Sequence, residues 1–172
     1  MINKWNFQTP SEEELHKRDQ LVAELGFSPV ICLLLVQRGI TSIEEAKKFF
    51  KPSLNDLHDP FLMPDMDKAV RRLNKALGNK EKILIYGDYD VDGTTAVSLV
   101  FKYLRPYSST LDFYIPDRYD EGYGISYKGI DYAAENGVSL VISLDCGIKA
   151  IEKIEYAKEK GIDFIICDHH MP

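Results

Sequence analysis

Short apolar runs alternate with amphipathic stretches through the second part of the chain. The runs predict four strands, at residues 83–86, 111–115, 140–144 and 163–167. The stretches between and before them predict four helices, at residues 66–77, 94–104, 126–135 and 148–160. Regular alternation of helices with almost wholly apolar strands is typical of a parallel sheet that is covered by helices on both faces. We therefore expect an α/β fold, with Asp65 capping its first helix and Gly78 ending it.

The first part of the chain shows helix signals that prolines interrupt. The predicted helix starts are Ser11 (with Glu14 as its capping-box partner), Ser28 and Thr41 or Ser42. The prolines of the irregular connection that follows are Pro52, Pro60 and Pro64. The sequence thus predicts two regions, a small helical region at 1–64 and an α/β domain at 65–172.

The two helices around Gly39 also admit a helix-turn-helix that binds DNA. The second of them begins Ile43-Glu44-Glu45-Ala46, whereas a recognition helix favours basic and amide side chains at its start. We therefore favour a small helical packing module.

Composition places the chain among ordinary folded proteins. Its 172 residues are 45% hydrophobic and 28% charged, which excludes a disordered tail or a fibrous repeat. The longest apolar stretch, 30–36, is far shorter than the ~20 residues that span a bilayer, and no apolar signal follows Met1. A cytoplasmic protein is expected. The net charge of −6 argues against a general nucleic-acid binder unless bound cations offset it.

The cysteines indicate neither a disulfide framework nor a zinc site. They are three, widely spaced, without a CxxC pair, and each lies in an apolar run: Cys32, Cys146 and Cys167. We expect all three to be reduced core residues.

Carboxylates and imidazoles follow three of the four predicted strands. They are Asp88, Asp90 and Asp92 after the first strand, Asp145 after the third, and Asp168, His169 and His170 after the fourth. The carboxyl ends of parallel strands share one edge of the sheet, so these groups should converge. Two carboxylates ~4 Å apart repel by roughly 4 kcal/mol at an effective dielectric near 20, which bound cations would offset. Oxygen ligands with imidazoles suit Mg²⁺ or, better, Mn²⁺, and two ions ~3.5–4 Å apart are plausible.

Two other kinds of site share parts of this pattern. The spacing of Asp88, Asp90, Asp92 and Gly93 matches the start of a calcium-binding EF-hand loop, but the twelfth position is Leu99 instead of glutamate. A phosphoacceptor receiver domain also has acids at strand ends, but it has no use for His169-His170. We reject the first alternative and disfavour the second.

Three motifs resemble those of a known family. Gly87-Asp88-Tyr89-Asp90-Val91-Asp92-Gly93, Leu144-Asp145-Cys146-Gly147-Ile148 and Asp168-His169-His170 are similar to the first three motifs of the DHH phosphoesterase superfamily. Supporting matches are Ile115-Pro116-Asp117-Arg118, Glu121-Gly122-Tyr123-Gly124 and Leu57-His58-Asp59-Pro60-Phe61-Leu62. The resemblance runs from about residue 28 to the end and is closest to bacterial exonucleases specific for single-stranded DNA.

The resemblance implies a metal-dependent 5′→3′ exonuclease of DNA repair or recombination that releases 5′-mononucleotides from single-stranded DNA. The implied metal ligands, for Mn²⁺ or Mg²⁺, are Asp90, Asp92, Asp145 and His169. The implied catalytic residues, which orient imidazoles and water or touch the phosphate, are Asp88, Asp168 and His170. The candidates for contacts with the DNA backbone are Arg118, Gly122 and Gly124, although the two glycines fit a plain turn equally well.

The resemblance also implies further parts and leaves alternatives. Members of the superfamily carry a fourth motif with another metal-binding aspartate and a C-terminal domain, so we expect an amino-terminal fragment whose own activity is weak or absent. Other members act on small nucleotides or pyrophosphate, and some replication factors resembling the family are non-catalytic scaffolds. The amino-terminal helical region favours the exonuclease, and the retained acids and histidines count against the scaffold.

Overall fold

The computed structural model describes residues 9–172 and divides after Pro60 into two compact units. Within the described residues, no helix combines the length and the apolar character that crossing a membrane requires.

The first unit consists of three short helices around a small core. They are α1 (Glu12–Leu25), α2 (Pro29–Gln37) and α3 (Ile43–Phe50). The predicted starts are confirmed, because the hydroxyls of Ser11, Ser28 and Ser42 each accept a backbone N–H of the first turn. Its buried residues are Leu21, Cys32, Leu35, Val36 and Ala46. Two 3₁₀ turns follow, η1 (Leu54–Asp56) and η2 (Pro60–Leu62).

The second unit is a parallel sheet with helices on both faces, as predicted. Its elements in chain order are α4 (Met66–Gly78), β1 (Lys82–Gly87), α5 (Val91–Leu104), β2 (Leu111–Tyr114), α6 (Tyr127–Glu135), β3 (Val138–Leu144), α7 (Ile151–Glu159) and β4 (Asp163–Cys167). All strands run parallel in the order β2-β1-β3-β4. From β1 the chain crosses to β2 on one side, and from β2 it crosses back to β3 on the other side of β1. The boundary between β1 and β3 is therefore the switch point, the place where α/β sheets bind ligands.

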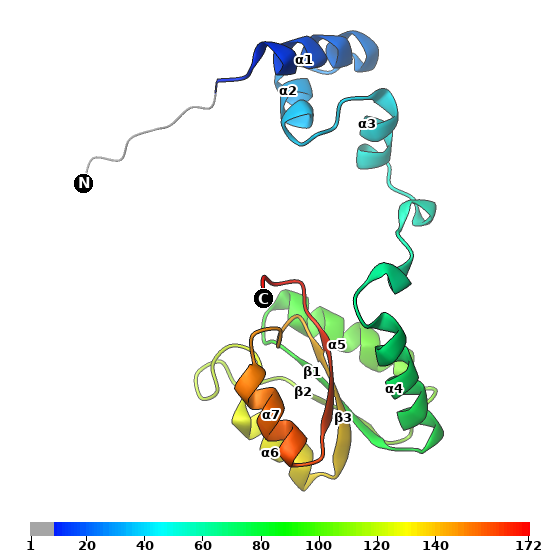
Figure 1. Cartoon of the computed structure of the whole chain (residues 1–172), viewed down its shortest axis with the longest axis vertical. Helices are drawn as coiled ribbons and strands as arrows, with labels where there is room; N and C mark the ends of the chain where they lie inside the picture. The colour runs from blue at the N-terminus through cyan, green and yellow to red at the C-terminus, as the bar shows by residue number, and fades with distance from the viewer. Residues whose placement is uncertain (1–8) are drawn as a thin grey trace, which may run out of the picture. The chain divides into compact units, whose positions relative to one another are not determined.

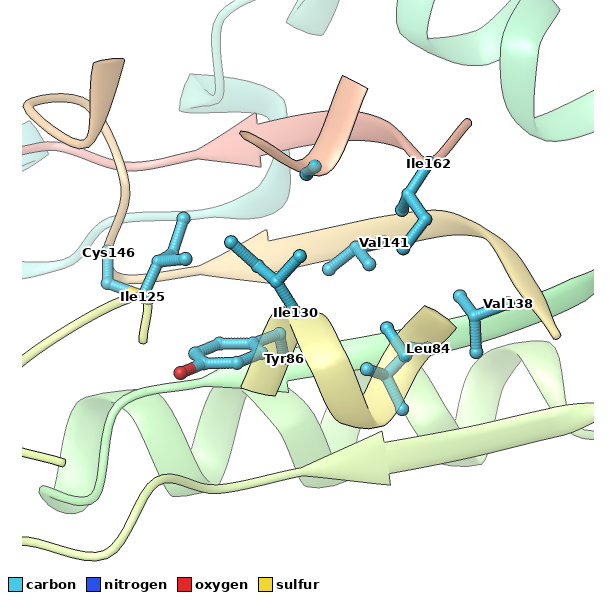
Figure 2. Close-up of a cluster of buried hydrophobic side chains, with 10 residues drawn as sticks. Leu84, Tyr86, Ile125, Ile130, Val138, Val141, Cys146 and Ile162 are labelled. Carbon is cyan, nitrogen blue, oxygen red and sulfur yellow. The ribbon is translucent and has the colours of Figure 1, made fainter. Parts of the chain in front are cut away.

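Alternate side chains of the strands fill two separate cores. On one face, Leu84, Tyr86 and Val141 pack against α6 and α7 with Ile130 and Ala157. Figure 2 shows this cluster between the sheet and α6. On the other face, the alternate strand residues Ile83, Ile85 and Ile142 pack against α4 and α5, the helices that cover this face in Figure 1. Burial on both faces explains why the strand sequences are continuous apolar runs.

Two helix boundaries differ from the prediction. Helix α5 begins three residues earlier than expected, because the Asp90 carboxylate accepts the N–H groups of Asp92 and Gly93 and so caps the helix. Helix α7 begins three residues later than expected, at Ile151, because residues 147–150 form a separate turn in which the N–H of Ala150 donates to the carbonyl of Gly147 at 2.9 Å.

Helix α4 begins at Met66 as expected and ends one residue later than expected, but its caps differ from the prediction. Asp65 adopts a left-handed conformation (φ 59°) and makes no cap hydrogen bond, and its carboxylate instead lies 2.7 Å from Lys68 Nζ. Gly78 is the last helical residue rather than the stop, and the left-handed turn falls at Lys80 (φ 57°).

The cysteines are free, but they do not all lie in the core. Cys32 and Cys146 are buried as expected. Cys167 is exposed, because it ends β4, the strand at one edge of the sheet. The expectation of three core cysteines was therefore wrong for Cys167.

Candidate metal site at the carboxyl ends of the strands

Three acids follow residues that pair side by side in the sheet. Leu144 of β3 pairs with Gly87 of β1 on one side and with Cys167 of β4 on the other. The residue directly after each of these strands is an aspartate, namely Asp88, Asp145 and Asp168. Adjacent strands lie about 4.8 Å apart, so this register brings the three acids to one edge of the sheet.

Asp145, His169 and His170 form a candidate ligand set. One ligand atom from each lies within 4.8 Å of the other two. The Asp145 carboxylate is 3.2 Å from His169 Nε2, and its side chain is only 11% exposed, against 77% for His169. Carboxylate oxygen with imidazole nitrogen is a donor set that suits Mn²⁺.

The backbone of Asp145 is held in a left-handed conformation. Its φ of 61° is unusual for a residue other than glycine. The N–H of Asp145 donates to the carbonyl of Cys167 at 2.9 Å, which continues the β3–β4 pairing past the strand end. Local strain of this kind costs about 1–3 kcal/mol and is concentrated at functional sites.

Asp168 fixes the orientation of His170 through hydrogen bonds. One Asp168 oxygen accepts both the backbone N–H (3.1 Å) and ring Nδ1 (2.6 Å) of His170, and the other accepts the N–H of Ile148 at 2.9 Å. The hydroxyl of Tyr123 lies 3.3 Å from the second ring nitrogen of His170. The carboxylate thus fixes the direction of the imidazole, as acids behind metal-binding histidines do.

Asp88 is fully buried at the end of β1. Its Oδ1 accepts the N–H of Gly124 at 3.4 Å, whereas its Oδ2 has no hydrogen-bond partner among the described residues. The start of α5 packs directly on it, since a Cβ at Gly93 would lie 2.6 Å from the backbone nitrogen of Asp88. A buried carboxylate oxygen without a donor is costly unless a cation or water completes it.

The remaining two predicted ligands, Asp90 and Asp92, lie outside the ligand set of Asp145, His169 and His170. Asp90 is exposed, and its Oδ1 accepts the N–H groups of Asp92 and Gly93, both at 3.0 Å. Asp92 is exposed in the first turn of α5. Among the described residues, neither belongs to the close group of Asp145, His169 and His170. Their assignment as ligands stays a prediction.

The loop between β2 and α6 lies against this edge of the sheet. Glu121 holds it together, because its carboxylate accepts the hydroxyl of Tyr114, the N–H of Asp117 and the hydroxyl of Ser126. Tyr86 of β1 donates to the carbonyl of Gly124 at 3.0 Å.

The predicted substrate contacts lie on this loop. Gly122 and Gly124 both have positive φ. The N–H of Gly124 donates to Asp88 Oδ1 at 3.4 Å, and the assignment of Gly124 as a substrate contact stays a prediction. Arg118 is exposed and stacks over the ring of Tyr89, 5.3 Å from its centroid.

Two tyrosines beside the site were not singled out from the sequence. Tyr89 contacts Tyr123 edge to face (6.3 Å between centroids), and Tyr123 contacts His170 in the same manner at 6.2 Å. Both lie within motifs that carried the resemblance, between the acids of 87–93 and between the glycines of 121–124. Their positions inside these motifs are the signal that could have identified them.

The charge of the acids acts on neighbouring groups. Burial, followed by the charges of Asp88, Asp168 and Asp145, raises the pKa of the Cys146 thiol to about 12, so this cysteine is unreactive at neutral pH. Burial and the same three acids also raise the pKa of Tyr123. The edge of the sheet is therefore strongly negative.

Fold and site together define a parallel α/β domain with a candidate divalent-metal site at the carboxyl ends of β3 and β4, next to its switch point. The profile of the DHH family, N-terminal domain, matches residues 82–172. The chain belongs to the DHH family.

Relatives of known name agree with this assignment. The single-stranded-DNA-specific exonuclease RecJ of Bacillus subtilis (strain 168) is 41% identical over 169 residues, which are 98% of this chain and 21% of that protein. RecJ of Escherichia coli (strain K12) is 32% identical over 161 residues, 92% of this chain and 27% of that protein.

Solved structures with the same fold include two RecJ proteins. RecJ from Thermus thermophilus in complex with Mn²⁺ has a TM-score of 0.67 and 25% identity, over 92% of this chain and 22% of that one. An exonuclease RecJ bound to manganese has a TM-score of 0.56 and 31% identity, over 61% of this chain and 27% of that one. The chain thus spans about a fifth to a quarter of the length of these relatives.

Proposed function

We propose that a protein carrying this chain is a metal-dependent 5′→3′ exonuclease of DNA repair or recombination that hydrolyses phosphodiester bonds of single-stranded DNA. The observation that carries the proposal is the convergence of Asp145, His169 and His170 at the end of the sheet. The names of the relatives support the substrate. The direction of digestion is inferred from the resemblance of the motifs.

The residues present fit a divalent cation such as Mn²⁺ or Mg²⁺. Asp145, His169 and His170 would hold it, and the unpartnered Oδ2 of Asp88 marks a buried carboxylate at the same strand ends. Asp90 and Asp92 are the candidates for the ligands of a second ion. A bound divalent cation lowers the pKa of water and stabilises negative charge that develops on a phosphate.

The side chains of the chain supply orientation and substrate contacts. Asp168 accepts a hydrogen bond from the Nδ1–H group of His170, which leaves Nε2, 3.3 Å from the Tyr123 hydroxyl, as the nitrogen with a lone pair for a metal. Arg118, stacked on Tyr89, presents a guanidinium that can bind a DNA phosphate through two N–H groups. Gly122 lies on the same loop and has no side chain that would keep a phosphate away from its backbone.

Metal binding is tested on the chain itself. In a calorimetric titration with Mn²⁺ at about pH 7.5, we expect binding to the wild type and a loss of at least tenfold in affinity for Asp145→Asn. Asp67→Asn is the matched control, because Asp67 is an exposed aspartate of α4 that pairs with Arg71. Absence of binding, or equal binding by Asp145→Asn, would contradict the proposed site and favour a non-catalytic scaffold.

Activity is tested on the longest protein that carries this chain. A 5′-phosphorylated single-stranded oligonucleotide is compared with pyrophosphate and with a dinucleotide in the presence of Mn²⁺. We expect release of mononucleotides from the oligonucleotide, abolished by Asp145→Asn. Turnover of the small substrates alone would instead assign the protein to the branch of the family that acts on small nucleotides.

A further inference from the structure

A hollow of about 430 Å³ lies in the first unit, between the end of α1 and the last turn of α3. Its apolar walls are formed by Leu25, Phe27 and Phe50, together with Ala46, which is buried. All residues that line the hollow belong to the first unit, so it shares none with the candidate metal site.

Three phenylalanine rings at this hollow remain exposed. The exposed fractions are 41% for Phe27, 54% for Phe49 and 49% for Phe50. Phe50 contacts the other two rings edge to face, with 5.5 Å between its centroid and that of Phe27 and 5.2 Å to that of Phe49. Large apolar side chains that are exposed in a group and bordered by polar residues mark an interaction surface.

Positive charge gathers at the same end of α3. The first turn of the helix is acidic, whereas its last turn and its C-cap carry Lys47, Lys48 and Lys51, and all three line the hollow. Lys48 Nζ lies 3.6 Å from a carboxylate oxygen of Asp56. Among the described residues, no carboxylate lies within 4.0 Å of the ammonium group of Lys47 or of Lys51. Two unpaired cations therefore border the exposed rings, and their electrostatic complement is an anion.

Exposed aromatic rings beside unpaired lysines are the combination that binds single-stranded nucleic acids. Bases stack on the rings while the lysines contact the phosphates, and every base has a face that can stack. In a duplex these faces are covered by the neighbouring base pairs. An acidic peptide would engage the lysines, but only particular residues would give it flat rings for the phenylalanines.

The position of these groups also differs from that in a helix-turn-helix. A recognition helix contacts bases with its N-terminal residues, and in α3 these include Glu44 and Glu45. The lysines and the rings lie at the opposite end of the helix. The arrangement therefore favours contact with a flexible single strand rather than the reading of a duplex groove.

We propose that the α3 surface, formed by Phe27, Phe49, Phe50, Lys47 and Lys51, binds single-stranded DNA without sequence preference. This is a second contact for the strand, since the surface shares no residue with the candidate metal site. The inference rests on the proposed function, because the ligand is the proposed substrate of the whole protein.

The lysines are tested with the whole chain and a fluorescently labelled oligothymidylate of about 12 nucleotides, with EDTA present so that no metal contributes. Fluorescence anisotropy is measured over a series of salt concentrations. The double variant with Lys47→Ala and Lys51→Ala should bind about tenfold more weakly at low salt. The slope of log affinity against log salt should fall by about 0.7 for each lysine that contacts a phosphate.

The matched control for the lysines is the double variant with Lys75→Ala and Lys102→Ala. It removes two exposed lysines of the second unit and so changes the net charge by the same amount. This control should bind as the wild type does. An equal loss of affinity in both double variants would show that only the net charge matters, which would overturn the proposed surface.

The rings are tested with Phe49→Leu, which keeps an apolar side chain but removes the face on which a base can stack. We expect affinity to fall about fivefold or more, with a melting curve that shows the variant to be folded. Tyr103→Leu is the control, because Tyr103 is an aromatic residue of α5 that is 68% exposed. Wild-type affinity in a folded Phe49→Leu variant would overturn the stacking role and with it the proposal.

Two competing ligands separate single-stranded DNA from other polyanions. A DNA duplex and polyglutamate, each compared with the oligothymidylate at equal charge, should bind about tenfold more weakly or worse. Equal affinity for the duplex would favour the helix-turn-helix alternative. Equal affinity for polyglutamate would assign the surface to an acidic protein partner. Either result would overturn the proposal.

The outcome is distinguishable from a failure of the proposed function. A longer protein that digests single-stranded DNA, with binding by this chain that is unaffected by the lysine and Phe49 variants, overturns the α3 surface and leaves the proposed function standing. Binding that depends on these residues, in a protein that digests no single-stranded DNA, supports the α3 surface and contradicts the proposed function.

Discussion

Asp168 accepts a 2.6 Å hydrogen bond from the imidazole of His170, although its own side chain is almost completely buried. Burial, the largest single influence, disfavours the charged carboxylate, but the N–H groups of Ile148 and His170 and the imidazole outweigh it, so the pKa of Asp168 is lowered. The hydrogen bond to Asp168 is also the main reason why the pKa of His170 is raised. An ionised carboxylate can only accept, so Nδ1 of His170 must carry the proton.

We predict that Asp168→Asn weakens Mn²⁺ binding ten- to a hundredfold, because outer partners of this kind hold a ligand imidazole in its tautomer and orientation. An asparagine would also place its amide N–H₂ group against the N–H of either Ile148 or His170, which lowers thermal stability. Calorimetry at neutral pH and a melting curve measure the two effects, with Asp67→Asn as the control. A less stable variant with wild-type affinity for Mn²⁺ would show that Asp168 is only structural.

A second prediction separates the two roles of Asp90. Its carboxylate caps α5, and asparagine caps helices about as well, whereas alanine does not. Asp90→Ala should therefore lower the free energy of unfolding by about 1 kcal/mol, and Asp90→Asn should leave it nearly unchanged. If Asp90 also binds metal, Asp90→Asn will weaken Mn²⁺ binding without loss of stability. Wild-type affinity in this variant would restrict Asp90 to capping.

A third prediction concerns the close contact between α5 and β1. Gly93→Ala should destabilise the protein by about 1–3 kcal/mol, because the new Cβ would lie 2.6 Å from the Asp88 nitrogen and 2.8 Å from its carbonyl carbon, and backbone atoms cannot move aside. Gly78→Ala is the matched control. It lies in α4 with open space around it and should stabilise the protein by roughly 1 kcal/mol. Urea unfolding measures both, and equal effects would show that the contact at Gly93 relaxes freely.

The sequence predicted the sheet because strands that are buried on both faces consist of consecutive apolar residues. The strands around Ile85 and Ile142 are unbroken apolar runs between turn residues, and they alternate regularly with amphipathic helices, unlike the apolar run at 30–36, which forms α2. It also predicted that Asp145 and His169 would converge, because the carboxyl ends of parallel strands share one edge. These conclusions depend only on local pattern and on the geometry of parallel sheets.

Other features depend on contacts between residues far apart in the chain. The N–H of Ile148 donates to Asp168 across 20 positions, and the N–H of Gly124 donates to Asp88 across 36 positions. The register that aligns Gly87, Leu144 and Cys167 is set by packing on both faces of the sheet. No local pattern encodes such contacts, so they could not be predicted from the sequence.

The last prediction concerns acid stability. Glu81 accepts hydrogen bonds from Ser139 at 2.7 Å and from Arg72 at 2.8 Å, which in that order lower the pKa of its carboxyl group from 4.5 to about 2. Because the pKa is lower in the folded state, this carboxylate stabilises the protein above about pH 4.5, and the stabilisation is lost as the pH falls toward 2. The full shift is equivalent to roughly 3 kcal/mol. Screening at this partly exposed position reduces the contribution to about 1 kcal/mol.

Glu81→Gln should therefore be less stable than the wild type by about 1 kcal/mol at neutral pH, and this difference in the free energy of unfolding should narrow below about pH 4. Urea unfolding across this range measures the difference, and Glu159→Gln, at an exposed position of α7, should show none. A difference that stays constant with pH would mean that Glu81 acts through packing rather than through its charge.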